Sequence, residues 1–234
     1  MKKIITASLL TSTLLLTSSI ANAAASDFAS TGKMGTLGAG LDITYGINSK
    51  LNTRINFNGG KLNADDQNDG IHYKGDLKAQ TVGGLLDFYP AGGAFRLTAG
   101  LYNNANKLDL VTSGASNNNV FVGDRAYDLS KARLDANVKF KSTAPYLGLG
   151  WGNPVSKGSK WNFSFDAGVL FQGAPEATLK GSGQAKDIAT GLALNLATDP
   201  TFQSELSKEE KNLNNDLKDF KAYPVVSLGA SYRF

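Results

Sequence analysis

Apolar and polar residues alternate with a period of two along most of this chain. In KWNFSFDAGVLFQG (160–173), Trp161, Phe163 and Phe165 fall on one side of an extended strand, and Asn162 and Ser164 fall on the other. The same pattern recurs in TLGAGLDITYG (36–46), LNTRINFN (51–58), FRLTAGLYN (95–103) and LGASYRF (228–234), where it continues to the last residue. A period of two over this many segments predicts an all-β protein.

The N-terminal segment MKKIITASLLTSTLLLTSSIANA has the organisation of a secretory signal peptide. Lys2 and Lys3 form a basic start, an apolar and hydroxyl-rich stretch follows, and Ala21-Asn22-Ala23 is a small-residue cleavage site. A membrane-spanning helix is the alternative, but six Ser and Thr interrupt the second half of the stretch. The sequence therefore predicts a signal peptide at 1–23 and one domain at 24–234.

The composition restricts the class of protein. The chain has no cysteine, which excludes disulfides and thiolate sites, and the charge of 24 − 20 = +4 gives no indication of nucleic-acid binding. Beyond the signal peptide, no window of about 18 apolar residues predicts a membrane-spanning helix. A mean hydropathy of −0.20 suits a transmembrane β-barrel, whose strands have one polar and one apolar side. We therefore expect an antiparallel barrel in the outer membrane of a Gram-negative bacterium.

Connection lengths predict the topology of this barrel. The short connections are 47–50, 90–93 and 154–160, and they alternate with long ones at 61–76, 108–136 and 173–222. Short periplasmic turns and long extracellular loops are typical of such barrels. The alternation predicts seven strands near 36–46, 51–60, 77–89, 94–107, 137–153, 160–172 and 223–234, with a bulge at Pro145 in the fifth. Two periplasmic termini require an even number, so we expect an eighth strand within 25–34.

Aromatic residues gather beside the short connections and the C-terminus, on the apolar side of their strands: Tyr45, Phe88, Phe95, Trp151, Trp161, Tyr232 and Phe234. They predict a girdle at the periplasmic interface of the membrane. The alternative is the core of a β-sandwich. The end of the chain, with Tyr232 and Phe234, resembles the signal by which the barrel assembly machinery recognises outer-membrane proteins.

Several blocks resemble a proteobacterial family of small outer-membrane barrels that is CarO-like and more distantly OmpW-like. They are GTLGAGL (35–41), DGIHYKGDLK (69–78), GGLLDFYPAGGAFRLTAGLY (83–102), APYLGLGWGN (144–153), FSFDAGVLFQGAPE (163–176) and DLKDFKAYPVVSLGASYRF (216–234). The resemblance implies an eight-stranded barrel, with passage of small solutes such as amino acids, and it transfers no catalytic residue. The implied surroundings are outer-membrane lipid and lipopolysaccharide.

Six charged residues fall on the polar, inward side of the predicted strands: Asp42, Arg54, Asp87, Arg96, Asp166 and Arg233. An eight-stranded barrel is just wide enough for side chains to fill it. We expect these charges to form an ion-paired plug, since an unpaired charge in a confined interior is costly. The alternative is a gated path for a small solute.

The remaining candidates for chemistry are weak, and the sequence predicts neither an enzyme nor a cofactor or metal site. His72 is the only histidine and has no nucleophile motif beside it, which leaves a lipid-modifying enzyme as the least favoured alternative. The acidic run DDQNDG (65–70) lacks the spacing of an EF-hand loop.

One helix is expected in the last long connection. Asp199-Pro200 reads as an N-cap followed by Pro at the first helical position. An apolar stripe then follows at Phe202, Leu206, Leu213, Leu217 and Phe220, and the opposite face carries Lys208, Glu209, Lys211, Asp216 and Lys218. The helix is expected to pack on its own connection or over the barrel mouth, and binding a partner is the alternative.

Overall fold

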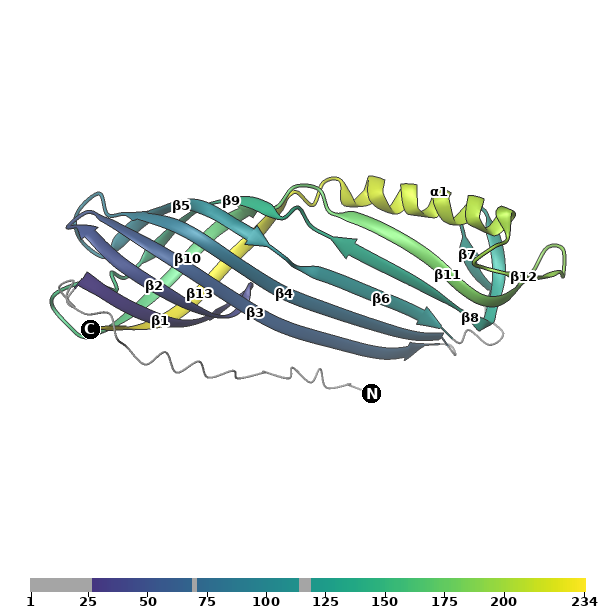
Figure 1. Ribbon diagram of the computed structural model, residues 1–234, viewed down its shortest axis with the longest axis horizontal. Helices are drawn as coiled ribbons and strands as arrows, with labels where there is room; N and C mark the ends of the chain where they lie inside the picture. Colours follow the sequence, from purple (N-terminus) through teal and green to yellow (C-terminus); the bar gives the residue numbers. More distant parts are fainter. Residues whose placement is uncertain (1–26, 69–70, 114–118) are drawn as a thin grey trace.

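The structure, a computed structural model, describes residues 27–68, 71–113 and 119–234 (Figure 1). The predicted signal peptide lies outside the described residues. Among the described helices, none is both long and apolar enough to cross a membrane.

Eight antiparallel strands close into a barrel, as the sequence predicts. They are β1 (Phe28–Gly35), β2 (Gly38–Asn48), β3 (Leu51–Asn68), β4 (Ile71–Phe88), β5 (Phe95–Asn104), β9 (Thr143–Trp151), β10 (Trp161–Phe171) and β13 (Ala222–Arg233). Each pairs with the next in this order, and β13 pairs with β1 from Ala29↔Arg233 to Gly35↔Ser227. The eighth strand expected within 25–34 is therefore confirmed as β1.

The three long connections are present as expected, but most of their described residues form paired strands, which the sequence did not predict. Residues 61–76 continue the β3–β4 hairpin far beyond the barrel, with Lys61 opposite Lys78 and Asp65 opposite Lys74. The segment 137–153 is two strands, because β8 ends at Lys139 and β9 starts at Thr143. Pro145 lies in regular pairing with Leu101 and not at a bulge.

The other two connections form a sheet that extends the hairpin. Its strands are β6 (Lys107–Ser113), β7 (Asn119–Val122), β8 (Arg125–Lys139), β11 (Glu176–Asp187) and β12 (Ala193–Asn195). They join the upper part of β4 in the order β4-β6-β8-β11-β12, and β7 pairs with β8. We call this sheet, including residues 60–68 of β3 and 71–79 of β4, the distal sheet. Figure 1 shows it projecting from the barrel end remote from the C-terminus.

The polarity of the two sides of the sheet inverts where the hairpin leaves the barrel. Within the barrel, outward Phe57 is 43% exposed and inward Asn58 is 7% exposed. Beyond Gly59 the outward side becomes charged, beginning with Lys61, and the side continuous with the barrel interior becomes apolar, beginning with Leu62. Strand pairing places on this apolar side Leu77, Leu108, Leu110, Leu134, Ala136, Val138, Ala177 and Leu179. The barrel needs an apolar exterior, whereas the distal sheet builds a core on its inner side.

The helix α1 (Pro200–Leu217) covers part of this apolar side (Figure 1). The expected start is confirmed, because the Asp199 side chain accepts a hydrogen bond from the Phe202 N–H (2.8 Å) and Pro200 opens the helix. Phe202 packs on Gly181, where a Cβ would approach its ring within 2.5 Å. Phe220 was wrongly assigned to the apolar stripe, because it lies beyond the helix and is 62% exposed.

Candidate functional site: the charge network inside the barrel

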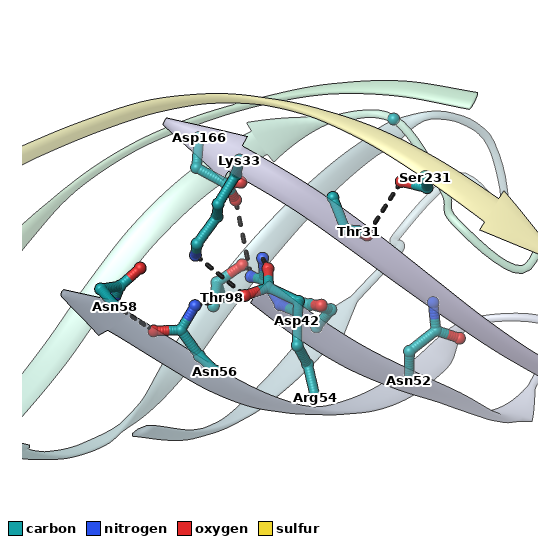
Figure 2. A network of polar contacts seen from close by, with 12 residues as sticks. Thr31, Lys33, Asp42, Asn52, Arg54, Asn56, Asn58, Thr98, Asp166 and Ser231 are labelled. Carbon is teal, nitrogen blue, oxygen red and sulfur yellow. Dashed lines mark hydrogen bonds and ion pairs between the residues drawn. The ribbon is translucent and has the colours of Figure 1, made fainter. Parts of the chain in front are cut away.

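Charged side chains from neighbouring strands meet in the barrel interior (Figure 2). Arg54 of β3 is central, because its Nη1 lies 3.0 Å from Asp42 Oδ2 of β2 and its Nη2 lies 2.9 Å from Asp87 Oδ1 of β4. The same Nη2 lies 3.5 Å from Asp166 Oδ1 of β10. One guanidinium thus contacts three carboxylates from three strands.

Arg96 of β5 links the network to β10. Its Nη2 donates to Asp166 Oδ1 at 2.7 Å, and its Nε lies 3.7 Å from Asp87 Oδ1. A further N–H of Arg96 donates to the carbonyl of Gly152. Gly150 leaves the space for this arrangement, since a Cβ there would lie 2.9 Å from both Arg96 Nε and Asp166 Oδ1.

Lys33 of β1 completes the charge balance, with its Nζ 3.1 Å from Asp42 Oδ1. The alternation in β1 is poor, so the sequence did not predict Lys33 as an interior charge. The register of β1 against β2 indicates the contact, because Lys33 pairs with Gly40, two residues before Asp42 on the same side of β2. The network therefore joins three carboxylates to three cations. All six side chains are at most 8% exposed, and a balanced set of this kind is what a confined interior requires.

Uncharged polar side chains extend the network along the interior. Thr98 donates to Asp87 Oδ1 (2.6 Å), and Asn56 donates to Asp42. Asn58 donates both to Asn56 (2.5 Å) and to Thr81 Oγ1 (2.8 Å). These bonds add neutral donors to Asp87 Oδ1 and Asp42 Oδ1, each of which already faces a cation.

An apolar layer lies between this network and the distal sheet. The Tyr102 and Tyr146 rings meet edge to face with centroids 5.6 Å apart, and they pack with the buried residues Leu37, Leu85, Ala144, Leu170 and Val225. A cavity bordered by Lys33 and Asn58 has a volume of about 10 Å³, which is room for about one water. Side chains therefore fill the barrel above the charges as well as around them.

The sixth predicted interior charge shares the inward side of its strand but lies away from the network. Arg233 is opposite Ala29 at the end of β13, and its backbone N–H donates to the Lys160 carbonyl (2.8 Å). It is thus at the terminal end of the barrel, whereas Asp166 pairs with Ser227 further along β13. The other five predicted residues are brought together by the fold.

The aromatic residues predicted at one end of the barrel do gather there. Tyr232 stacks edge to face on Trp161 with centroids 5.2 Å apart and on Phe234 at 5.7 Å. The Phe234 N–H donates to the Phe28 carbonyl (3.1 Å), which extends the β1–β13 seam to the last residue. Phe234 itself is 56% exposed. The position suits an interfacial girdle, and its role as an assembly signal stays a prediction.

His72 and the acidic run at 65–70 are not brought to the interior network. The backbone of His72 pairs with Gln67 and Ser113 within the distal sheet, and not in a loop as expected. Asp65 lies 3.8 Å from Lys74 across the same hairpin, and the end of the run, 69–70, lies outside the described residues.

Comparison with known proteins supports the architecture. No protein-family model matches the chain, and no curated protein matches it. Among solved structures, CarO2 of Acinetobacter baumannii superposes with a TM-score of 0.59 at 20% identity, covering 88% of this chain and 98% of that one. CarO of the same organism gives 0.57 at 20% identity, covering 88% and 97%. This chain therefore has the fold of the CarO barrels, which agrees with the resemblance of its sequence blocks.

Proposed function

We propose that this chain is an outer-membrane barrel that is closed to solutes and anchors the distal sheet on the cell surface. The membrane location is supported by the exposed apolar side chains around the barrel, among them Ile55, Leu86, Leu101, Leu147, Phe163 and Leu228, each at least 51% exposed. Such a belt is stable in lipid and unfavourable in water. The surroundings are then outer-membrane lipid and lipopolysaccharide, and insertion falls to the barrel assembly machinery.

The observation that carries the closed state is the charge network. Arg54 and Arg96 reach across the interior to carboxylates on other strands, and the layer around Tyr102 and Tyr146 lies above them. Passage of an amino acid, the other function expected from the sequence, would require these ion pairs to separate. The interior carboxylates and guanidinium groups could bind the two charges of a zwitterion only after their own ion pairs had separated.

Single-channel recording in planar bilayers tests the proposal, with a general porin as the detection control. We expect no stepwise conductance from the wild-type protein. The double variant Arg96→Ala/Tyr102→Ala removes interior side chains of β5 and should admit ions, whereas Leu97→Ala/Leu101→Ala removes outward side chains of the same strand and should stay silent. Stepwise openings of the wild-type protein would contradict a closed barrel.

The change of polarity along the β3–β4 hairpin also bears on which side of the membrane the distal sheet lies. The polarity inversion at Gly59 supports a membrane boundary there, because lipid requires an apolar exterior and water accepts Lys61 and the charges beyond it. The distal sheet then lies outside the cell, and the short turns face the periplasm.

A further inference from the structure

A hollow of about 220 Å³ lies between α1 and the apolar side of the distal sheet. Its walls come from β6, β7, β8, β11 and α1, and its apolar lining includes Leu110, Phe121, Leu134, Leu179, Leu206 and Leu213. Phe121 is 71% exposed and Leu110 is 42% exposed. The hollow is therefore open to solvent although its lining is mainly apolar.

The helix is held above the sheet by polar contacts and does not collapse onto it. Glu210 accepts a hydrogen bond from the Leu179 N–H (2.7 Å). Asn214 accepts from the Ala177 N–H (2.9 Å) and donates to the Ala177 carbonyl (2.8 Å). These side chains hydrogen-bond to backbone groups on the unpaired edge of β11, and they hold one side of α1 at that edge.

The start of α1 is fixed independently. Phe202 is fully buried and meets the Tyr127 ring edge to face at 5.2 Å. Glu205 accepts from the Asp124 N–H (2.8 Å) and pairs with Lys208 (2.9 Å), and these contacts hold the pKa of Glu205 below its ordinary value, the backbone hydrogen bond being the larger cause. The space under the rest of the helix is thus built into the fold.

The size and lining of the hollow suit a small apolar body. An enclosed apolar cavity of about 150 Å³ lined by Leu, Ile and Phe takes up benzene, and this open hollow of about 220 Å³ has room for a somewhat larger molecule. Small-molecule sites in general are apolar hollows with a few placed polar groups. A single aromatic ring with a short side chain matches this hollow.

One carboxylate on the lining of the hollow, that of Glu209, has no partner among the described residues. Glu209 lines the hollow and shares a helix side with Leu206 and Leu213, so it does not belong to the charged face assigned from the sequence. Within the part of the chain that the structure describes, its carboxylate makes no hydrogen bond or ion pair. The other bordering charges, Asp135 and Lys180, face each other in the β8–β11 ladder on the opposite side of the sheet.

We propose that this hollow binds a small amine with an apolar body, such as an arylalkylamine. The ring lies among the leucines under α1, and the ammonium group pairs with the Glu209 carboxylate. An anionic ligand of the same body is disfavoured, because it would bring a second negative charge to Glu209. The inference goes beyond the anchoring function and is independent of whether the barrel conducts.

Fluorine NMR on the full mature chain in lipid nanodiscs tests the proposal. The sequence has no cysteine, so a trifluoromethyl label can be placed singly at Thr112→Cys or at Thr178→Cys. Thr112 borders the hollow, and Thr178 lies on the opposite, charged side of the sheet, where it pairs with Asn137. Phenethylamine is the ligand probe, and 3-phenylpropanoate is its anionic counterpart.

We expect phenethylamine to shift the label at Thr112 saturably and to leave the label at Thr178 unchanged. 3-Phenylpropanoate should bind about tenfold more weakly or worse, and Glu209→Gln should remove most of that difference. Absence of a saturable shift at Thr112, or equal shifts at both labels, would overturn the site. Equal affinity for the amine and the carboxylate would overturn the assignment of an amine.

Discussion

Arg54 is the side chain on which the interior network most depends, and its replacement gives the sharpest test of the buried charges. Arg54→Met retains much of the apolar stem and removes the guanidinium. Asp42, Asp87 and Asp166 then share only Lys33 and Arg96, so the balanced network gains a net charge of −1, from 3 − 3 to 2 − 3. Figure 2 shows Lys33, Asp42, Arg54 and Asp166 close together inside the barrel.

The expected cost follows from the hydrogen bonds that the guanidinium makes. Two charge-assisted bonds, to Asp42 (3.0 Å) and Asp87 (2.9 Å), disappear, and each is worth roughly 1.5–3 kcal/mol. The Arg54 side chain is 4% exposed, so water does not replace its bonds readily. Removing one partner of a buried ion pair typically costs about 3–5 kcal/mol, and we expect Arg54→Met to lower the free energy of unfolding by that amount.

Urea unfolding in liposomes measures this loss, with the fluorescence of Trp151 and Trp161 as the signal. Arg133→Met is the matched control, because Arg133 is 54% exposed and pairs with Asp135, so its loss should cost about 0–1 kcal/mol. Adding Asp87→Asn to Arg54→Met should restore part of the stability by removing one uncompensated carboxylate. Equal losses for Arg54→Met and Arg133→Met would refute the reasoning.

Three further predictions concern other parts of the chain. Deleting Phe234 should reduce the yield in the membrane fraction far more than it reduces the stability of refolded protein, where the lost burial is about 1–3 kcal/mol; a parallel drop in both quantities would show that Phe234 only packs. Epitope tags at Gly191 should be reached by antibody on intact cells and tags at Ser49 should not, with reversed labelling contradicting the orientation. The hydrogen bond from the Thr190 N–H, followed by the contact with Arg125, lowers the pKa of Asp187. The stabilisation that ionised Asp187 gives to the turn should therefore be complete above about pH 4–5 and decline as the pH falls through the lowered pKa. Hydrogen exchange of the turn measures this pH dependence, and Asp187→Asn should abolish it.

The barrel could be predicted from the sequence because each of its strands faces lipid on one side and a polar interior on the other. Lipid outside and a polar interior impose the alternation seen at Phe163, Ser164 and Phe165, and that alternation also indicates where strands end at the short turns. The first strand was harder to define because Ser30 and Gly32 interrupt its apolar, outward side. Only the parity of the strand number indicated that it had to exist.

The distal sheet was missed because its alternation has the opposite sense. Leu77, Leu108 and Leu110 continue the inward side of the barrel, whereas an alternation typical of lipid exposure would place apolar residues outward. The signal was present in KLDL (107–110), where Leu108 and Leu110 alternate with Lys107 and Asp109. The length of these connections predicts loops, whereas their described residues form paired strands.

The sequence was sufficient to identify which charged residues line the interior, but not which acid pairs with which base. Inward parity identified Asp42, Arg54, Asp87, Arg96 and Asp166, since each lies on the polar side of an alternating strand. Which acid meets which base depends on strand stagger and on the space left by a residue such as Gly150, and neither can be read from the alternation.

The inversion at Gly59 connects the barrel to the hollow under α1. A hairpin that continues from lipid into water needs an outward side that turns polar at the membrane boundary, and here the two sides exchange polarity at that point. Inside the barrel, that rule places charges inward, where they pair and fill the space. Beyond the boundary, the same inward side becomes apolar, and only part of it is covered by α1. The uncovered apolar surface at Leu110 and Phe121 is therefore a consequence of building the distal sheet on barrel strands, and α1, held at the edge of β11 by Glu210 and Asn214, bounds a hollow over that surface.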